Sequence, residues 1–379
     1  MPDLPEWLSG GSPAQRFAHG LIHGEHALVL AGPPDVVRLP DPVDPAYLAY
    51  LTELGLGPRS GHAVAAPRVA LPEPSLVAFA GQKHHIRAKA IELGVPVAEG
   101  EVVTLPMAGG RRRRDYDALR AAVERHLRPT GRVIVRGAQG EAGTSTFVVG
   151  GGGEDVEGLL RRLAEREDNR VYLVEALVTA TVSPHVQLHV APDGGPVTCV
   201  GVTDQRWERP FVHGGNIYPS TGWSVDAMLG WSLRLARWLQ GRGYSGLLGL
   251  DFVEYADPAI ARARTLLAEV HPRMDGATYP LAILQRLNAA QRRAGRVESA
   301  AFVSGTLEVR PCSFARFRRA AERFLYAPGT GRGMVPYQVS RLSEGRCGMV
   351  LLGGSRDEVL RGYGELQTWC RRMEAPGSR

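Results

Sequence analysis

The sequence predicts a mixed α/β (α+β) protein with more than one domain. Three observations support this prediction. Short apolar runs with strand character alternate with amphipathic, helix-like segments along most of the chain. A glycine-rich loop near residue 140 joins two of the strand-like runs, which is typical of a small sheet. The length of 379 residues exceeds one ordinary core, so two or three domains are expected.

The first segment, over about residues 1–80, has a strand–turn–strand–helix order of the βαβ type. Residues 26–31 and 36–40 are apolar runs bounded by turn residues, so both are predicted strands. Residues 44–55 predict a helix, because a proline stands near the start and a glycine at the end.

From residue 81 to 175 the order becomes helix, strand, helix, strand, glycine loop, strand, helix, strand. The glycine loop and its neighbours form one predicted α+β unit. The predicted helices are 83–94, 115–127 and 155–166, and the predicted strands are 95–97, 132–136, 146–149 and 171–175.

Strands alternate with a single tryptophan-containing helix over residues 176–300, and a compact tail follows. The helix is expected at 226–240, where it could serve a core or a homodimer interface. The expected strands are 184–190, 197–202, 249–255, 266–270 and, in the tail, 349–352, before a final helix at 356–373.

Composition indicates a globular protein of the cytoplasm. Hydrophobic residues make up 44% and charged residues 22%, and no stretch approaches the roughly 18 apolar residues of a membrane span. The first residues lack the basic and apolar regions of a signal peptide. The four cysteines are scattered without a CxxC pair, which favours reduced thiols over disulfides or a zinc site.

The formal charge of +6 is carried mostly by arginine, whose planar fork suits phosphate and carboxylate groups. A GC-rich coding bias would raise arginine equally well. Nucleic acid is not the expected partner, because no helix-turn-helix, finger or RNA-binding motif is present. The run Arg111–Arg114 is predicted to be a solvated loop, and the alternative is attraction of ATP or an acidic peptide.

The loop over residues 137–145 could bind phosphate. Gly140 and Gly143 allow backbone N–H groups to approach a phosphate closely, and Thr144 and Ser145 add hydroxyl donors. The loop lacks the Gly-Lys-Ser/Thr of a P-loop, so an ordinary hairpin turn is the alternative.

Two cations stand where they could also contact phosphate. Lys83 precedes or begins a helix, and Arg136 ends the strand that leads into the glycine loop. The alternative for each is a surface ion pair, which is the commoner fate of a single cation.

The strand over residues 171–175 ends on Glu175 and continues as an apolar linker through Ala176 and Leu177. Backbone groups of such a linker could bind the edge of an adenine, with Glu175 accepting from its exocyclic amine. A solvent-exposed glutamate at a strand end is the alternative.

The segment from Gly249 to Leu281 predicts a metal site on two neighbouring antiparallel strands. Asp251 and Glu269 are predicted to lie at adjacent ends of the two strands, and carboxylate ligands of this kind suit Mg²⁺ together with phosphate oxygens. His271 could be a third ligand. Arg273 could neutralise an anionic intermediate, and Arg206, in a polar loop, could lie near the same pocket.

These features, in this order over about residues 81–300, resemble the ATP-grasp superfamily. The flanking segments at 35–51 and 333–349 resemble those of the pheganomycin-type peptide ligases. The resemblance implies the ATP-grasp fold, with a pre-ATP-grasp N-terminal domain at 1–114, a lid subdomain at 115–175, a core subdomain at 176–304 and a small C-terminal domain at 305–379.

The resemblance also implies an ATP-dependent ligase that phosphorylates a carboxylate and joins it to an amine, in the biosynthesis of a peptide natural product. ATP and Mg²⁺ are then the cofactors. A small carboxylate or an amino-acid or peptide acceptor and an amine donor are the substrates. Two departures stand out: Arg136 replaces the usual lysine, and His271 replaces the usual asparagine, which shifts metal preference toward Mn²⁺ or Zn²⁺. A nucleotide-binding homologue without ligase activity is the alternative, followed by an arginine-rich nucleic-acid binder.

Overall fold

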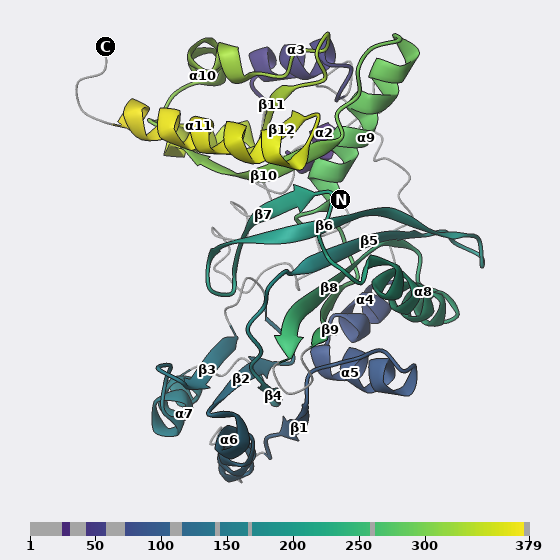
Figure 1. Cartoon of the computed structure of the whole chain (residues 1–379), viewed down its shortest axis with the longest axis vertical. Helices are drawn as coiled ribbons and strands as arrows, with labels where there is room; N and C mark the ends of the chain where they lie inside the picture. Colours follow the sequence, from purple (N-terminus) through teal and green to yellow (C-terminus); the bar gives the residue numbers. More distant parts are fainter. Residues whose placement is uncertain are drawn as a thin grey trace. The chain divides into compact units, whose positions relative to one another are not determined.

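The computed structural model describes residues 25–30, 43–57, 73–106, 116–140, 145–165, 169–257 and 262–374 (Figure 1). The chain forms two compact units. Unit 1 comprises Met1–Ala70, Gly214–Ser220 and Asp275–Arg379, and unit 2 comprises Leu71–His213 and Thr221–Met274. In the described part of the chain, no helix is long and apolar enough to cross a membrane.

Unit 2 contains a four-stranded antiparallel sheet with the strand order β1-β4-β2-β3. The strands are β1 (Gly100–Thr104), β4 (Val171–Ala176), β2 (Arg132–Gly137) and β3 (Thr146–Gly150). One face packs against α6 (Asp117–Thr130) and α7 (Val156–Glu165), as Figure 1 shows. Because side chains alternate along a strand, Val133 and Val135 enter this core, whereas Arg136 lies on the opposite face.

A second antiparallel sheet of unit 2 consists of β6 (Val197–Arg209), β5 (Pro184–Val190), β8 (Gly246–Asp257) and β9 (Arg262–His271), in that order. Its buried face packs against α5 (Lys83–Glu92) and α8 (Val225–Gln240). Helix α4 (Pro74–Ala80) comes directly before α5 in the sequence and contacts it. Val186, Leu250 and Phe252 lie in this core. The residues between them in each strand therefore leave the sheet on the other face.

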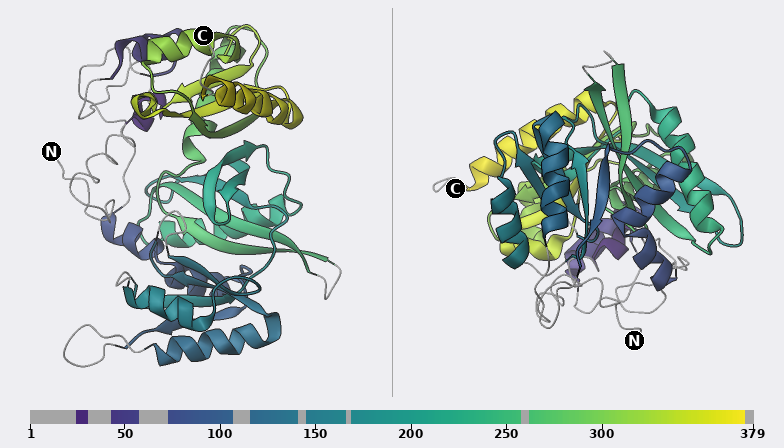
Figure 2. Two further views of the ribbon diagram at one scale, coloured as in Figure 1. Left: turned by 90° about the vertical axis from the view of Figure 1, so that its left-hand side faces the viewer. Right: turned by 90° about the horizontal axis from the view of Figure 1, so that it is seen from below.

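Unit 1 contains the antiparallel strands β11 (Gly333–Tyr337), β12 (Arg346–Gly353), β10 (Ala301–Glu308) and residues 214–218 of β7 (Val212–Tyr218). Helix α11 (Arg356–Glu374) lies along this sheet, as Figure 1 and the left view of Figure 2 show, and α9 (Thr278–Arg293) contacts it as well. The other helices among the described residues of unit 1 are α2 (His26–Leu30), α3 (Pro45–Glu53), α10 (Phe314–Ala320), and the short η2 (Glu322–Phe324) and η3 (Val339–Glu344).

Two tyrosines of α3 attach that helix to the edge strand β11. The hydroxyl of Tyr47 donates to the carbonyl of Pro336 at 3.1 Å, and that of Tyr50 donates to the carbonyl of Met334 at 3.3 Å. Both side chains are buried, so each hydroxyl needs a partner. The edge of the unit 1 sheet is thereby covered by a helix.

The structure corrects several predicted elements. Residues 26–30 form the helix α2 rather than a strand, because a short apolar run does not distinguish the two. The predicted strand at 36–40 lies outside the described residues. Residues 278–293 and 301–308, for which no element was predicted, form α9 and β10.

The division into four segments stays a prediction, since the two compact units follow a coarser division. Strand β1, at residues 100–104, pairs with β4 and belongs to the small sheet of unit 2.

Candidate active site

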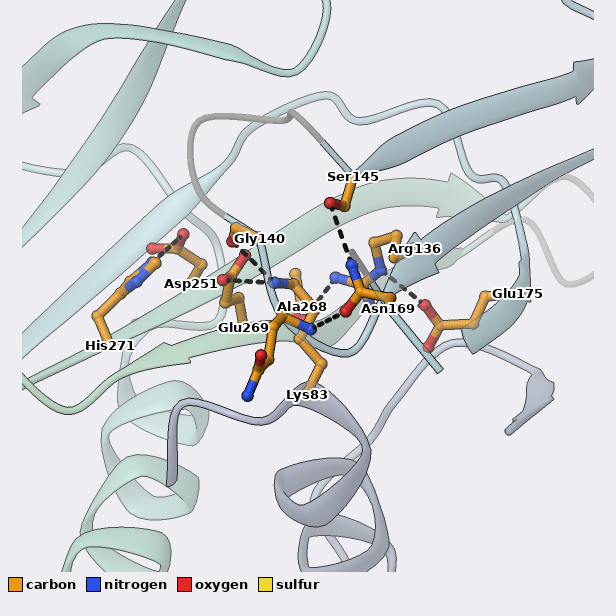
Figure 3. A network of polar contacts seen from close by, with 11 residues as sticks. Lys83, Arg136, Gly140, Ser145, Asn169, Glu175, Asp251, Ala268, Glu269 and His271 are labelled. Atoms are coloured by element: carbon orange, nitrogen blue, oxygen red, sulfur yellow. Dashed lines mark hydrogen bonds and ion pairs between the residues drawn. The ribbon is translucent and has the colours of Figure 1, made fainter. Parts of the chain in front are cut away.

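Lys83 connects the glycine loop to strand β9. It is the first residue of α5, and its backbone N–H donates to the carbonyl of Ala138 at 3.1 Å. Its ammonium group lies 2.9 Å from Oε1 of Glu269 and 3.4 Å from the carbonyl oxygen of Gly140 (Figure 3). Only 8% of the Lys83 side chain is exposed, so this cation is held in place rather than solvated.

Arg136 and Glu175 form a buried ion pair on the face of the small sheet that points away from α6 and α7. Nε of Arg136 donates to Oε2 of Glu175 at 2.9 Å, and Nη2 donates to the same oxygen (Figure 3). Nη1 donates to the carbonyl of Ala268 on β9 at 2.8 Å. Arg87 of α5 donates to the other oxygen of Glu175 at 2.8 Å.

Glu175 was predicted to accept from an adenine. Both of its oxygens are instead engaged by guanidinium groups, and the residue is only 2% exposed. Ala176 ends β4, and its N–H donates to the carbonyl of Glu99 at 2.8 Å. Leu177 follows directly and is partly buried. That the backbone of this linker binds an adenine stays a prediction. In the structure the carboxylate of Glu175 pairs with two arginines and offers no oxygen without a partner to the exocyclic amine of an adenine.

Asn169 braces the two ends of the glycine loop. Its Oδ1 accepts from the N–H of Gln139 at 2.8 Å, and its Nδ2 donates to Oγ of Ser145 at 3.3 Å (Figure 3). Gly140 is required by this close approach, since a Cβ at that position would lie 2.8 Å from Oγ of Ser145. The predicted loop residues Gly143 and Thr144 lie outside the described residues.

The two predicted carboxylates lie side by side. Asp251 on β8 and Glu269 on β9 are directly opposite each other in the antiparallel register, and a bulge follows Asp251. The same row continues across the sheet to His185 on β5 and Thr203 on β6. Residues opposite each other across antiparallel strands share a face, so this row is one polar surface. Asp251 lies within its strand, however, and not at a strand end as predicted.

Asp251 lies between two histidines. Nδ1 of His185 is 2.6 Å from Oδ1, and Nε2 of His271 is 2.9 Å from Oδ2. Burial alone would raise the pKa of Asp251, but the charge of His271 and the hydrogen bonds of both imidazoles lower it strongly. Burial in turn opposes protonation of His271, yet the Asp251 carboxylate raises the pKa of His271 above its ordinary value.

The neighbouring charges are compensated in the same way. Burial disfavours the ionised form of Glu269, but the ammonium group of Lys83 lowers the pKa of Glu269. Burial also disfavours the charged form of Arg136, and the carboxylates of Glu175 and Glu269 outweigh this and raise the pKa of Arg136. The site therefore holds its carboxylates ionised beside protein cations.

The two arginines predicted to act on the intermediate lie in different places. Arg273 follows β9, with its N–H donating to the carbonyl of His271 at 2.8 Å, and its charge acts on His271. Arg206 is three residues beyond Thr203 on β6, so strand alternation directs it to the face opposite the polar row. Arg273 is thus placed beside His271, and Arg206 is directed away from the polar row.

A small cavity of about 10 Å³ lies within this set of charged groups, which is room for about one water molecule. Its polar lining is Lys83, Arg87, Arg136, Glu175 and Glu269. Apolar side chains complete the wall, namely Ala80, Ile86, Val97, Leu173, Leu267, Ala268 and Val270. The lining thus combines three cations and two carboxylates with an apolar wall.

The fit of a metal ion depends on Asp251 and Glu269. Adjacent carboxylates are ligands that Mg²⁺ accepts together with phosphate oxygens. Among the described residues, no three histidine, cysteine, aspartate or glutamate side chains form a ready metal cluster. His271 faces the carboxylate of Asp251 through Nε2, so in this arrangement it is a partner of Asp251. The two carboxylates fit the ion, provided that Asp251 gives up a histidine contact.

Three residues of this network were not predicted from the sequence. Arg87 stands four residues after Lys83 on the same helix face, and this spacing was the available signal. His185 is one of three polar residues that alternate with apolar ones in β5, and it stands opposite Asp251. Asn169 precedes β4 without any local motif, so nothing in the sequence marks it.

No protein-family model matches the sequence, and no curated protein matches it. Comparison of structures does find similar folds. N5-carboxyaminoimidazole ribonucleotide synthetase from Thermus thermophilus is 15% identical, with a TM-score of 0.54 over 81% of this chain and 77% of that chain. Biotin carboxylase from Campylobacter jejuni, as a β,γ-ATP complex, is 15% identical, with a TM-score of 0.53 over 80% and 72%.

A further similar structure is carboxyaminoimidazole ribonucleotide synthase from Aspergillus clavatus, complexed with ATP. It is 14% identical, with a TM-score of 0.52 over 80% of this chain and 76% of that chain. At such identities the likeness concerns the fold. The mixed α/β architecture and the antiparallel sheets agree with it, and the chain has the ATP-grasp fold.

Proposed function

We propose that this protein is an ATP-dependent ligase that forms a C–N bond between a carboxylate and an amine. The observation that supports it most is the grouping of Lys83, Arg136 and Glu269 around one cavity in unit 2 of an ATP-grasp fold, with Asp251 directly opposite Glu269 on the neighbouring strand. Two cations beside two ionised carboxylates are the groups that phosphoryl transfer needs. That similar folds include structures complexed with ATP agrees with the proposal.

In this proposal Lys83 and Arg136 bind the phosphates of ATP, and the loop from Gly140 to Ser145 covers them. A carboxylate oxygen of the substrate attacks the γ-phosphorus of ATP, which gives an acylphosphate and releases ADP. The amine then attacks the acyl carbon, loses a proton and expels inorganic phosphate. Arg273 stabilises the anionic intermediate next to Asp251. Because an acylphosphate reacts with water, the loop must keep water out until the amine arrives.

Asp251 and Glu269 would hold Mg²⁺, with Mn²⁺ as a possible substitute and His271 as a neighbour that modulates Asp251. When bound, the ion would offset the charge of the phosphoryl group. The chain contributes the charge balance: Lys83 compensates Glu269, and His185 and His271 compensate Asp251. Arg206 has no support as a catalytic residue, since it leaves β6 on the opposite face from Asp251.

The finer features of the proposal rest on the resemblance of the sequence to peptide ligases. They are a small carboxylate or an amino-acid or peptide acceptor, an amine donor, a role in natural-product biosynthesis, and a cytoplasmic location. A homodimer is a further proposal. Helix α8, which was considered as an interface, buries Met228, Leu235, Ala236 and Leu239 in the core of unit 2.

The test begins with thermal stability in the presence of a non-hydrolysable ATP analogue, with and without Mg²⁺. A ligand at about 100 times its Kd should stabilise the protein by roughly 2.7 kcal/mol. A Mg²⁺-dependent shift, followed by ADP release with one of a panel of carboxylates and amines, supports the ligase. Nucleotide binding without ADP release for any pair favours a binding protein, and no shift contradicts the proposal.

A further inference from the structure

Glu175 is shared between two arginines that come from different elements. Arg87 of α5 holds Oε1, and Arg136 of β2 holds Oε2 through two nitrogens. Arg87 is 8% exposed and Glu175 is 2% exposed. A carboxylate buried to this degree is costly unless both its oxygens are satisfied, so the geometry of Glu175 depends on both partners.

Arg136 is anchored with donors to spare. Its Nε and one N–H of Nη2 bind Glu175, and one N–H of Nη1 binds the carbonyl of Ala268. A guanidinium group has five N–H donors in a fixed plane, so two remain for a ligand. Because the anchors and the remaining donors belong to one rigid plane, fixing Glu175 also fixes where the remaining donors point.

Arg87 ties Glu175 to its surroundings. Its Nη1 donates to Glu175, and its Nη2 donates at 3.0 Å to the carbonyl of Gly100 on β1. Gly100 is opposite Glu175 in the β1–β4 register, so the guanidinium spans the pair of strands. Without Arg87 the Glu175 carboxylate would lose its hydrogen bond at Oε1, and Arg136 alone would neutralise its charge.

We propose that Arg87 is a positioning residue for nucleotide binding: it fixes the Glu175 carboxylate, which in turn holds Arg136 so that two of its N–H groups face the phosphates of ATP. This inference rests on the proposed function, because Arg136 acts on phosphate only if the cavity binds a nucleotide. Arg87 itself need not touch the ligand. Its effect should therefore pass entirely through Arg136.

A double-mutant cycle tests this dependence. Arg87→Gln, Arg136→Gln and the double variant are compared with the native chain by calorimetric titration with a non-hydrolysable ATP analogue and Mg²⁺. We expect Arg87→Gln to weaken binding about tenfold or more, the loss typical of a hydrogen bond to a charged group. In the Arg136→Gln background the same change should have little further effect, because the group it positions is gone.

If Arg87 had only a general structural role, the result would differ. The loss of binding free energy in Arg87→Gln would then add to that in Arg136→Gln, and the double variant would show the sum of the two losses. Additive losses, or native affinity in Arg87→Gln, overturn the inference. Lys89→Gln removes a cation from the same helix that pairs with Glu92 instead, and it should bind as the native chain does. If Arg87→Gln fails to fold, Arg87→Lys keeps the buried charge but cannot bridge the Glu175 carboxylate and the Gly100 carbonyl as the guanidinium does, and it should show an intermediate loss. No binding by the native chain overturns the proposed function itself.

Discussion

Asp251 on β8 and Glu269 on β9 stand directly opposite each other, so two carboxylates share one face of an antiparallel strand pair. Like charges in this position repel each other. The chain offsets the repulsion with separate cations, since Lys83 binds Glu269 and two histidines bind Asp251. The carboxylates are thus kept ionised, which is the state in which they can bind a divalent ion.

The first prediction concerns Glu269→Gln. The substitution removes the negative charge that Lys83 neutralises and one proposed oxygen ligand, with little change in shape. We expect ADP formation to fall by about 10²–10³-fold, as for loss of one preorganised electrostatic group. The Mg²⁺-dependent part of the nucleotide-induced thermal shift should be lost as well.

Glu92→Gln is the control for this variant, because the Glu92 side chain is 69% exposed on α5. It should keep both the shift and the activity. Native Mg²⁺ dependence in Glu269→Gln would remove Glu269 from the proposed site.

The second prediction concerns His271→Asn. Nε2 of His271 is hydrogen-bonded to Oδ2 of Asp251, so a metal ion must compete with the imidazole for that oxygen. We expect the variant to need about tenfold less Mg²⁺ for half of the nucleotide-induced thermal shift, an effect of the size known for groups next to metal ligands. The measurement is a titration with Mg²⁺ and, separately, with Mn²⁺.

The exposed His189 on β5 provides the control His189→Asn, which should leave both titrations unchanged. A weaker response to both ions in His271→Asn would show the opposite role, namely that His271 is itself a ligand.

Glu254 illustrates a carboxylate that belongs to the fold. It lies on β8 near Asp251, is fully buried, and accepts from the backbone N–H groups of Trp223 and Ser224 and from the hydroxyl of Ser224. Glu254→Ala leaves these donors without their acceptor at the start of α8. We expect a loss of about 3 kcal/mol in the free energy of unfolding, measured by urea denaturation.

Glu254→Gln retains an acceptor oxygen and should lose less stability than the alanine variant. Both variants should bind the nucleotide normally when folded. A specific loss of nucleotide affinity with native stability would place Glu254 in the site instead.

Much of unit 2 was predictable because local signals agree with its tertiary contacts. The helix at 83–94, the strands at 132–136, 146–149 and 171–175, and the helix at 226–240 all correspond to observed elements within a few residues. Residues 26–31 failed because an apolar run of that length fits a strand or a helix equally, and packing of α2 against α9 decides between them.

The site was predictable only where its residues stand in sequence motifs. The register of Asp251 with Glu269 follows from two adjacent strands, and the structure has it. The partners of these residues follow less directly. The spacing of Arg87 from Lys83 on one helix face was a local signal. The contacts of His185 and Asn169 join segments that are distant in the sequence and leave no short-range pattern. Arg206 was predicted to lie near the same pocket as Asp251. The alternation of side chains along β6 instead directs it to the other face of the sheet, and this alternation could have been read from the sequence.

A pH-dependent prediction follows from Glu25 in unit 1. Burial raises the pKa of Glu25, and the hydrogen bonds from the backbone and hydroxyl of Ser340 oppose this only in part. The folded state therefore binds the proton more tightly than the unfolded state. The contribution to stability is complete below the ordinary pKa of Glu25 and is lost as the pH rises through the raised value.

Glu25→Gln should accordingly be more stable than the native chain at pH 7 to 8, because an amide at this place needs no desolvation of charge. The advantage should shrink as the pH falls toward about 4.5, where the native carboxyl is protonated too. Melting temperatures of the two proteins across this range check the prediction, and a constant difference would contradict it.

The last prediction concerns the brace of the glycine loop. Asn169 accepts from Gln139 and donates to Ser145, so it fixes both sides of the loop that is proposed to cover the phosphates. Asn169→Ala should weaken binding of the ATP analogue by about tenfold. This corresponds to the free energy of roughly one hydrogen bond that holds the loop in place. Ser145→Ala removes only the contact with Nδ2 of Asn169, so its affinity should lie between those of Asn169→Ala and the native chain. Asn169→Asp can still accept from Gln139 and from the hydroxyl of Ser145, but it places a negative charge beside the loop, so it should also weaken binding of the anionic analogue. Equal affinities in all four proteins, measured by calorimetry, would mean that nucleotide binding does not depend on this brace.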